Sequence, residues 1–193
     1  MNSDKPRTDP RILRTRQLLK DAFIDLMQEM DIEKISVNKI AERATVNRVT
    51  FYLHYRDIPD MMDKLAEEMY EDIQRALNNN PQDGTKEERD YYVMVNLLEH
   101  IAENAKFYKV VLASRRTPIF TERLLRMVSE SVVSKLENER ASFISKAGLQ
   151  KDIVVWYGSA ALIGTVVSWL RHDMPYTPQF LARQFTLLRS MQR

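Results

Sequence analysis

The chain has 193 residues, of which 44% are hydrophobic and 29% are charged, and its formal net charge is +2. These values are typical of a folded globular protein and exclude a disordered chain, which would carry fewer apolar residues and more net charge. Because the chain contains no cysteine, disulfide bonds, thiolate metal ligands and cysteine nucleophiles are excluded.

The charge is distributed unevenly. Residues 1–56 hold eleven Lys and Arg against eight Asp and Glu, whereas residues 57–193 hold eighteen against nineteen. A basic head on a neutral body is compatible with binding to nucleic acid. We therefore expect two domains, 1–56 and 57–193, with a connecting helix over 58–78.

Helical periodicity dominates the sequence, in which apolar residues recur at intervals of three and four and glycine occurs only four times. The fold class is therefore predicted to be all-α. Asp9 followed by Pro10 predicts the start of a first helix that continues to about Met30. The segment before it lacks the apolar core of a signal peptide, so we expect a cytoplasmic protein.

The next two helices are short, with Ser36 as the expected cap of one and Asn47 of the other. The second covers most of VNRVTFYLHYRD (residues 46–57), whose β-branched and aromatic residues would also suit a strand. A strand would not explain a cap at each end, so we favour a helix. Its buried side would hold Val46, Phe51 and Tyr55.

The same helix turns other side chains outward or to its flank, namely Arg48, Val49, Thr50, Tyr52 and His54. Two short helices joined by a tight turn, after a longer supporting helix, form a helix-turn-helix, whose second helix enters a major groove of DNA. The pattern therefore predicts that residues 1–56 bind DNA.

Helices continue through the body of the chain, giving eight or nine in total. Asp57 precedes the helix over 58–78, Thr85 and Glu88 form a capping box, and Gly148 marks a stop before an apolar helix. The later predicted ranges are 85–104, 105–114, 117 to about 143, 152–172, and 177 to near the C-terminus.

The helix over 152–172 contains the most apolar stretch of the chain, residues 153–170. It is nearly long enough to span a membrane, but it includes Ser, Thr and two Gly and has no partner span. A buried helix at a subunit interface explains it better, because its small residues permit two backbones to approach closely. We expect a homodimer and no membrane partner. The candidate interface residues are Gly158, Ala161, Gly164, Trp169, Phe180 and Phe185.

Aromatic and thioether side chains in the body could line an effector pocket, although most such residues in a helical domain form its core. The candidate ligand-binding residues are Tyr91, Tyr92, His100, Phe107, Tyr108, Phe120, Met127, Trp156 and Tyr157.

Catalysis is not expected. The three histidines, His54, His100 and His172, are far apart in the sequence, and no Gly-rich phosphate loop or nucleophile motif is present. No metal or other cofactor is predicted.

The run RTRQLLKDAFIDLMQEMDIEKISVNKIAERATVNRVTFYLHYRD (residues 14–57) resembles the N-terminal DNA-binding region of the TetR family of bacterial transcriptional regulators. GTVVSWL, followed by MPYTPQFLARQ, is similar to a C-terminal class of this family common in low-GC Gram-positive bacteria. The resemblance implies a homodimer on a palindromic duplex DNA operator, an effector pocket in the body, and an intersubunit four-helix bundle made by the last two long helices.

The resemblance also implies roles for individual residues in DNA binding. Arg48, Val49, Thr50 and Tyr52 would meet bases or nearby backbone, and Ser36, Asn38, Asn47, His54 and Arg56 would hold phosphates.

Two positions depart from the family pattern. Thr45 stands where glycine is usual in the turn, and a β-branched residue tolerates a positive φ poorly. Ile58 stands where the family often has a lysine that reaches a phosphate, so Arg56 or the helix terminus would have to replace it.

Three functions stay open on the sequence alone. The leading interpretation is a repressor released by a small apolar effector, and the second is an activator controlled by a protein coregulator. The third is a helical interaction module without operator binding, which the departures at Thr45 and Ile58 permit. The basic residues Arg7, Arg11 and Arg14 would either form an arm in the minor groove or be solvated charge.

Overall fold

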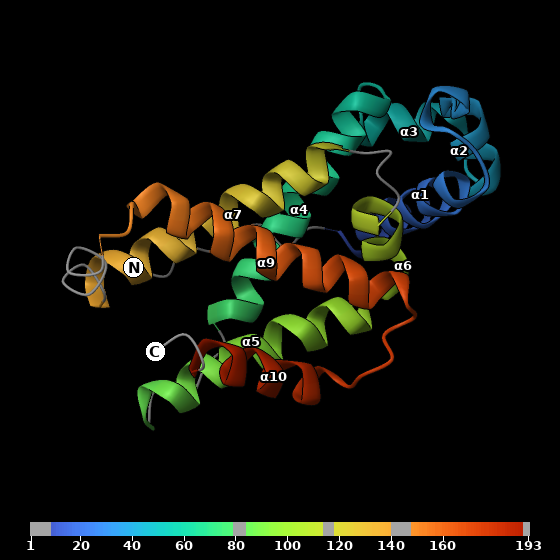
Figure 1. Ribbon diagram of the computed structural model, residues 1–193. Helices are drawn as coiled ribbons and strands as arrows, with labels where there is room; N and C mark the ends of the chain where they lie inside the picture. Colours follow the sequence, from blue (N-terminus) through green and yellow to red (C-terminus); the bar gives the residue numbers. More distant parts are fainter. Residues whose placement is uncertain (1–8, 79–83, 114–117, 140–147, 191–193) are drawn as a thin grey trace, which may run out of the picture. The chain divides into compact units, whose positions relative to one another are not determined.

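The computed structural model describes residues 9–78, 84–113, 118–139 and 148–190 (Figure 1). These residues form α-helices with two short helical turns of other types, and none of them is in a strand. The prediction of an all-α fold is confirmed. The chain divides into two compact units, one ending at Leu65 and the other beginning at Ala66.

The N-terminal unit is built on capped helices. Its elements are α1 (Pro10–Glu29), the 3-10 turn η1 (Ile32–Lys34), α2 (Val37–Arg43), α3 (Arg48–His54) and the beginning of α4 (Ile58–Asn78). The predicted caps are confirmed, because Asp9, Ser36 and Asn47 each accept a backbone N–H from the first turn of the following helix. Asp57 does the same for α4, accepting the Asp60 N–H at 2.8 Å.

Packing holds the short helices of this unit in place. Isolated helices of seven residues are marginal in water, so α2 and α3 depend on their neighbours. Here α2 packs on α1, and α3 packs on α2. A fork of two hydrogen bonds from Arg43 to Glu29, at 2.8 and 2.7 Å, ties α2 to α1. The fully buried side chains include Leu19, Phe23, Ile40, Phe51 and Tyr55.

The C-terminal unit contains the rest of α4 and a series of further helices. They are α5 (Lys86–Glu103), α6 (Ala105–Tyr108), the π-helical turn η2 (Lys109–Ala113), α7 (Pro118–Glu139), α9 (Lys151–Arg171) and α10 (Pro178–Ser190). Figure 1 shows α5 beside α10 and α7 beside α9. The capping box at Thr85 and Glu88 is confirmed. The predicted end of the helix near residue 143 lies outside the described residues.

The two units divide within α4 and not at the predicted position between residues 56 and 57. Side chains from the first two turns of α4 bond to the end of α3: Asp60 accepts the backbone N–H of Arg56, and Lys64 donates to the carbonyl of His54. These turns therefore belong with the N-terminal unit.

Helix α9 is unusually apolar at its surface. By length and composition alone, it is the single helix in the described part of the chain that could cross a membrane. One such helix is weak evidence, since a core helix of a soluble protein passes the same test. Only 33% of its most apolar 18-residue stretch is buried within the chain, so much of the apolar surface of α9 is not covered by other helices of its own protomer.

Candidate nucleic-acid interface and effector cleft

The turn between α2 and α3 is closed by two crossed backbone hydrogen bonds. Thr45 N–H donates to the Glu42 carbonyl at 3.0 Å, and Val46 N–H donates to the Ala41 carbonyl at 2.9 Å. This Schellman arrangement needs a left-handed residue just past the helix end, and Thr45 supplies it with φ = 56°. The turn therefore has the geometry that glycine suits, with strain of about 1 to 3 kcal/mol at Thr45.

Two rings anchor α3 in the N-terminal unit. Phe51 and Tyr55 are buried, with ring centroids 5.5 Å apart, and Val46 is half-buried beside the turn. On the rest of α3, Arg48, Val49 and Tyr52 are exposed, while Thr50 and His54 are half-buried. The side chains expected to meet DNA bases thus lie on the surface of α3 or at its edge.

Arg48 is held in place by Tyr52, one turn further along α3. Its Nη2 donates to the Tyr52 hydroxyl oxygen at 2.9 Å, its Nε donates to the same oxygen at 3.3 Å, and its guanidinium carbon lies 5.4 Å from the ring centroid. The Tyr52 ring meets the buried Phe51 ring edge to face, at 5.6 Å. Fixing a long side chain before binding lowers the entropy lost on binding. Arg48 is therefore preorganised on the exposed surface of α3.

A buried carboxylate organises the junction between α3 and α4. Asp60 accepts the backbone N–H of Arg56 at 2.9 Å, the Arg56 Nε at 3.1 Å, and an ion pair from Lys64 at 3.0 Å. These bonds, above all the one from the Arg56 backbone, lower the pKa of Asp60 to about 2. Lys64 also donates to the His54 carbonyl at 2.9 Å, so it satisfies one of the open carbonyls at the end of α3.

The residues expected to hold phosphates differ in exposure and in the bonds they already make. Ser36 and Asn47 already accept backbone N–H groups as caps, and Asn38 is exposed on α2. Arg56 is exposed although it bonds to Asp60. Burial, followed by the charges of Arg16 and Lys64, lowers the pKa of His54, which favours a neutral imidazole.

Ile58, which stands where the family often has a lysine, is half-buried. A cation near the end of α3 is supplied by Lys64, six residues later. In the proposed arm, Arg11 and Arg14 are exposed on α1, whereas Arg7 lies outside the described residues.

Leu53 was not among the residues expected to contact DNA, yet it is 78% exposed, one residue before the C-terminal end of α3. A signal for it is present in the sequence. Leu53 is two residues from each of the buried rings, Phe51 and Tyr55, which places it roughly 200° around the helix axis from them. Lys64 has no comparable signal, because its bond to His54 joins two different helices.

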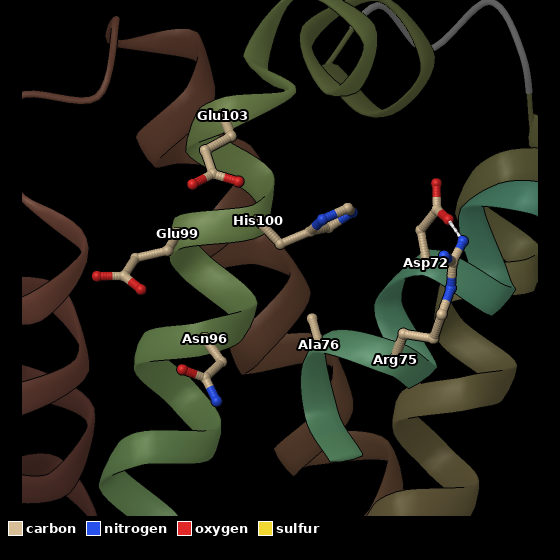
Figure 2. A pocket seen from close by; sticks show the side chains of 7 residues that line it. All are labelled: Asp72, Arg75, Ala76, Asn96, Glu99, His100 and Glu103. Atoms are coloured by element: carbon tan, nitrogen blue, oxygen red, sulfur yellow. Dashed lines mark hydrogen bonds and ion pairs between the residues drawn. The ribbon is translucent and has the colours of Figure 1, made fainter. Parts of the chain in front are cut away.

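A polar cleft of about 530 Å³ lies between α4 and α5 (Figure 2). The imidazole of His100 points from α5 toward α4, where Asp72 and Arg75 form an ion pair. His100 Nε2 lies 2.9 Å from the hydroxyl of Tyr108, a buried group whose pKa burial raises. The lining residues are Asp72, Arg75, Ala76, Asn96, Glu99, His100 and Glu103. Such a lining suits a polar solute and does not match the apolar effector expected from the sequence.

The candidate ligand-binding residues do not form one pocket. His100 lines the cleft, and Tyr108 contacts His100 without lining the cleft itself. Phe107 forms edge-to-face contacts with Tyr108 and with Phe120, both buried, so these rings are core. The others are dispersed: Met127 is buried, Tyr91 is half-buried, and Tyr92, Trp156 and Tyr157 are exposed.

The candidate interface residues divide in a similar way. Trp169 is only 4% exposed and its Nε1 donates to the Tyr176 carbonyl at 2.9 Å, so in the single chain it is a core residue. Gly158 and Phe185 are half-buried, and Ala161, Gly164 and Phe180 are exposed. Exposed residues without charge follow one side of α9, and we call them the α9 stripe: Ile153, Trp156, Tyr157, Ala160, Ala161 and Gly164.

Several known proteins resemble this chain over most of its length. Residues 91–190 match a TetR-type family described as the transcriptional regulator C-terminal region. The HTH-type dhaKLM operon transcriptional activator DhaS of Lactococcus lactis is 26% identical over 77% of this chain and 75% of its own. A TetR transcriptional regulator from Streptococcus agalactiae 2603V is 26% identical, with a TM-score of 0.66 and coverage of 93% and 96%. FadR from Bacillus subtilis, solved in complex with stearoyl-CoA, shares the fold at 19% identity, with a TM-score of 0.62 and coverage of 89% and 96%.

Proposed function

Because the chain belongs to the TetR family of transcriptional regulators, we propose that it binds a two-fold symmetric DNA operator as a homodimer, under the control of an effector bound in its C-terminal unit. The family consists of regulators and not of enzymes. The observation that carries the proposal is the exposed, preorganised Arg48 on a recognition helix fixed by two buried rings.

The surface of α3 has the chemistry that operator recognition needs. A fixed guanidinium can donate two hydrogen bonds to O6 and N7 of guanine, an interaction worth about 1 to 3 kcal/mol of discrimination. Amides and hydroxyls near the helix ends, such as Asn38 and Ser36, suit phosphate oxygens. The left-handed turn at Thr45 keeps α2 and α3 in the helix-turn-helix arrangement, which argues against an interaction module without operator binding.

A homodimer is supported by the α9 stripe. The stripe is long, free of charge and exposed in the single chain, and large exposed apolar patches mark interaction sites. Its small members, Ala160, Ala161 and Gly164, permit a second helix to approach closely. Two copies would place two α3 helices on one duplex, which a palindromic operator requires.

The effector is proposed to occupy the cleft between α4 and α5. Helix α4 begins in the N-terminal unit, and residues near its C-terminal end line this cleft. A ligand bound between Arg75 and His100 could therefore change the position of α4. Asp60 and Lys64, which bond to the end of α3, would pass that change on to α3. The polar lining favours a small polar effector. FadR, which shares the fold, was solved in complex with stearoyl-CoA, a ligand of a very different kind.

The direction of regulation has two candidates. A repressor released by its effector is the primary proposal. The relative DhaS is described as an operon transcriptional activator, and this favours activation as the second candidate, for which we propose control by a protein coregulator. In either case we propose that the protein acts in the cytoplasm.

In vitro selection from a random duplex pool tests the proposal. We expect enrichment of a palindrome whose affinity falls steeply with salt, because binding to phosphates releases counterions. A scrambled duplex of the same composition is the control. Recovery of no enriched sequence, or equal affinity for the scrambled duplex, would refute sequence-specific binding.

A further inference from the structure

The outermost side chains of α3 form an apolar ridge. Leu53 and Val49 are 78% and 66% exposed, and they are four residues apart, so they lie on the same side of the helix. Leu53 is the most exposed of the large hydrophobic residues in the described part of the chain. An apolar pair directly opposite the buried rings of α3 has no packing role within its own unit.

The surroundings of this pair indicate which partner covers it. Arg48, fixed by Tyr52, lies on one flank of the ridge, and Arg56 is exposed just beyond the C-terminal end of α3. Basic side chains around the ridge fit the negative charge of a nucleic acid. An apolar protein groove would be a poorer fit, since guanidinium groups would have to be desolvated beside it.

Within DNA, the apolar group that an exposed aliphatic side chain can meet is the C5 methyl of thymine, which lies in the major groove. A ridge at the outermost position of a recognition helix reaches furthest into that groove. Cytosine offers no methyl at the equivalent position, so contact with Leu53 distinguishes the two pyrimidines.

We propose that Leu53, together with Val49, determines operator specificity by packing on thymine methyl groups in each half-site. The inference rests on the proposed operator binding and deepens it. Arg48 then selects guanine on one flank, and the ridge selects thymine beside it. Leu53 contributes no charge, so it affects which sequence is bound and leaves the salt dependence unchanged.

The test replaces single thymines of the selected operator with deoxyuridine, which removes the methyl and keeps every hydrogen-bonding group. For the unmodified chain, we expect one or two thymine positions per half-site at which affinity falls about fourfold per methyl, as the burial of one such group implies. Leu53→Ala protein should bind the thymine and deoxyuridine duplexes equally at one or more of these positions, and any preference that is left should depend on Val49. Affinities are measured by fluorescence anisotropy.

Leu18→Ala is the matched control, because Leu18 is an exposed leucine of α1 in the same unit. This variant should keep the full thymine preference. Circular dichroism melting establishes that both variants are folded.

The outcomes separate the inference from the proposed function. If the operator is bound specifically but no thymine preference depends on Leu53, the ridge inference is wrong and operator binding stands. If Leu53→Ala changes the oligomeric state without changing the thymine preference, the ridge contacts a second copy of the chain, and the inference is also wrong. If no sequence is bound specifically, both proposals fail.

Discussion

Helices α3 and α9 both expose apolar side chains, but in different chemical surroundings. On α3, the exposed Leu53 and Val49 share the helix surface with Arg48, whose guanidinium is bonded to Tyr52. The α9 stripe contains no charged residue. A mixed apolar and cationic surface suits DNA, whereas an uncharged apolar stripe suits the same stripe on a second copy. The comparison supports our proposal that α3 recognises the operator sequence and α9 holds the two copies together.

A charge in the middle of the α9 stripe should have the largest effect. In Ala161→Arg, pairing the stripes would bury two like charges, so we expect a monomer by analytical ultracentrifugation. Because the second α3 then no longer binds as part of the same molecule, operator affinity should fall by a factor of about 10² or more.

Asn78→Arg is the control for this variant, since it adds the same charge at an exposed position of α4 in the C-terminal unit. It should remain dimeric. A dimeric Ala161→Arg protein with normal operator affinity would show that assembly uses another surface.

Changes at Arg48 should have the next largest effect. Arg48→Ala should lower operator affinity by about tenfold to a hundredfold, because it removes a bidentate base contact. Tyr52→Phe keeps the ring and removes the hydroxyl that fixes Arg48, so a smaller loss is expected. Neither variant should change the dimer. Equal affinities of all three proteins in an anisotropy titration would contradict a base-reading role for Arg48.

Thr45→Gly should change the stability of the turn before α3 and leave the α9 stripe unchanged. Glycine relieves the strain at φ = 56° but gains entropy in the unfolded chain, and the first effect is the larger one for a β-branched residue. We expect the free energy of unfolding to rise by about 1 kcal/mol in urea titrations. Thr45→Ala keeps the left-handed position occupied by a side chain and should gain less. Destabilisation by Thr45→Gly would mean that the turn is not strained.

The smallest expected effect concerns Asp60 and pH. The folded-state pKa of about 2 lies below the ordinary value of 3.8, so the carboxylate stabilises the fold fully above pH 3.8 and progressively less as the pH falls toward 2. Asp60→Asn should therefore be less stable than the unmodified chain at neutral pH, with a difference that shrinks below about pH 4. Unfolding curves of the two proteins across this range provide the measurement. A difference that does not change with pH would exclude this ionised bond network.

Local signals in the sequence were sufficient for most of the fold. Caps such as Asp9, Asn47 and the Thr85–Glu88 box are confirmed because each involves residues two or three apart, whose geometry the helix itself fixes. The departure at Thr45 was also visible, since glycine is the usual residue there. The structure adds that the turn keeps its left-handed residue.

Contacts between helices could not be predicted in this way. The bond from Lys64 to the His54 carbonyl and the contact of His100 with Tyr108 join different helices, and nothing in the sequence fixes how those helices pack. For the same reason Trp169, expected at the interface, is a core residue of its own chain, and the cleft beside His100 is polar. Leu53 is different, because its position opposite Phe51 could have been read from helical periodicity.

Hydroxyl-radical footprinting of the selected operator, combined with the mass of the complex, tests the central claim most directly. Two copies of the chain bound through α3 should protect two patches on one face of the duplex, about one helical turn or ~34 Å apart or a multiple of it. With Arg48→Ala, each patch should require about tenfold to a hundredfold more protein. A single protected patch bound by one chain, or a footprint that Arg48→Ala leaves unchanged, would contradict the assignment of recognition to α3 and of assembly to α9.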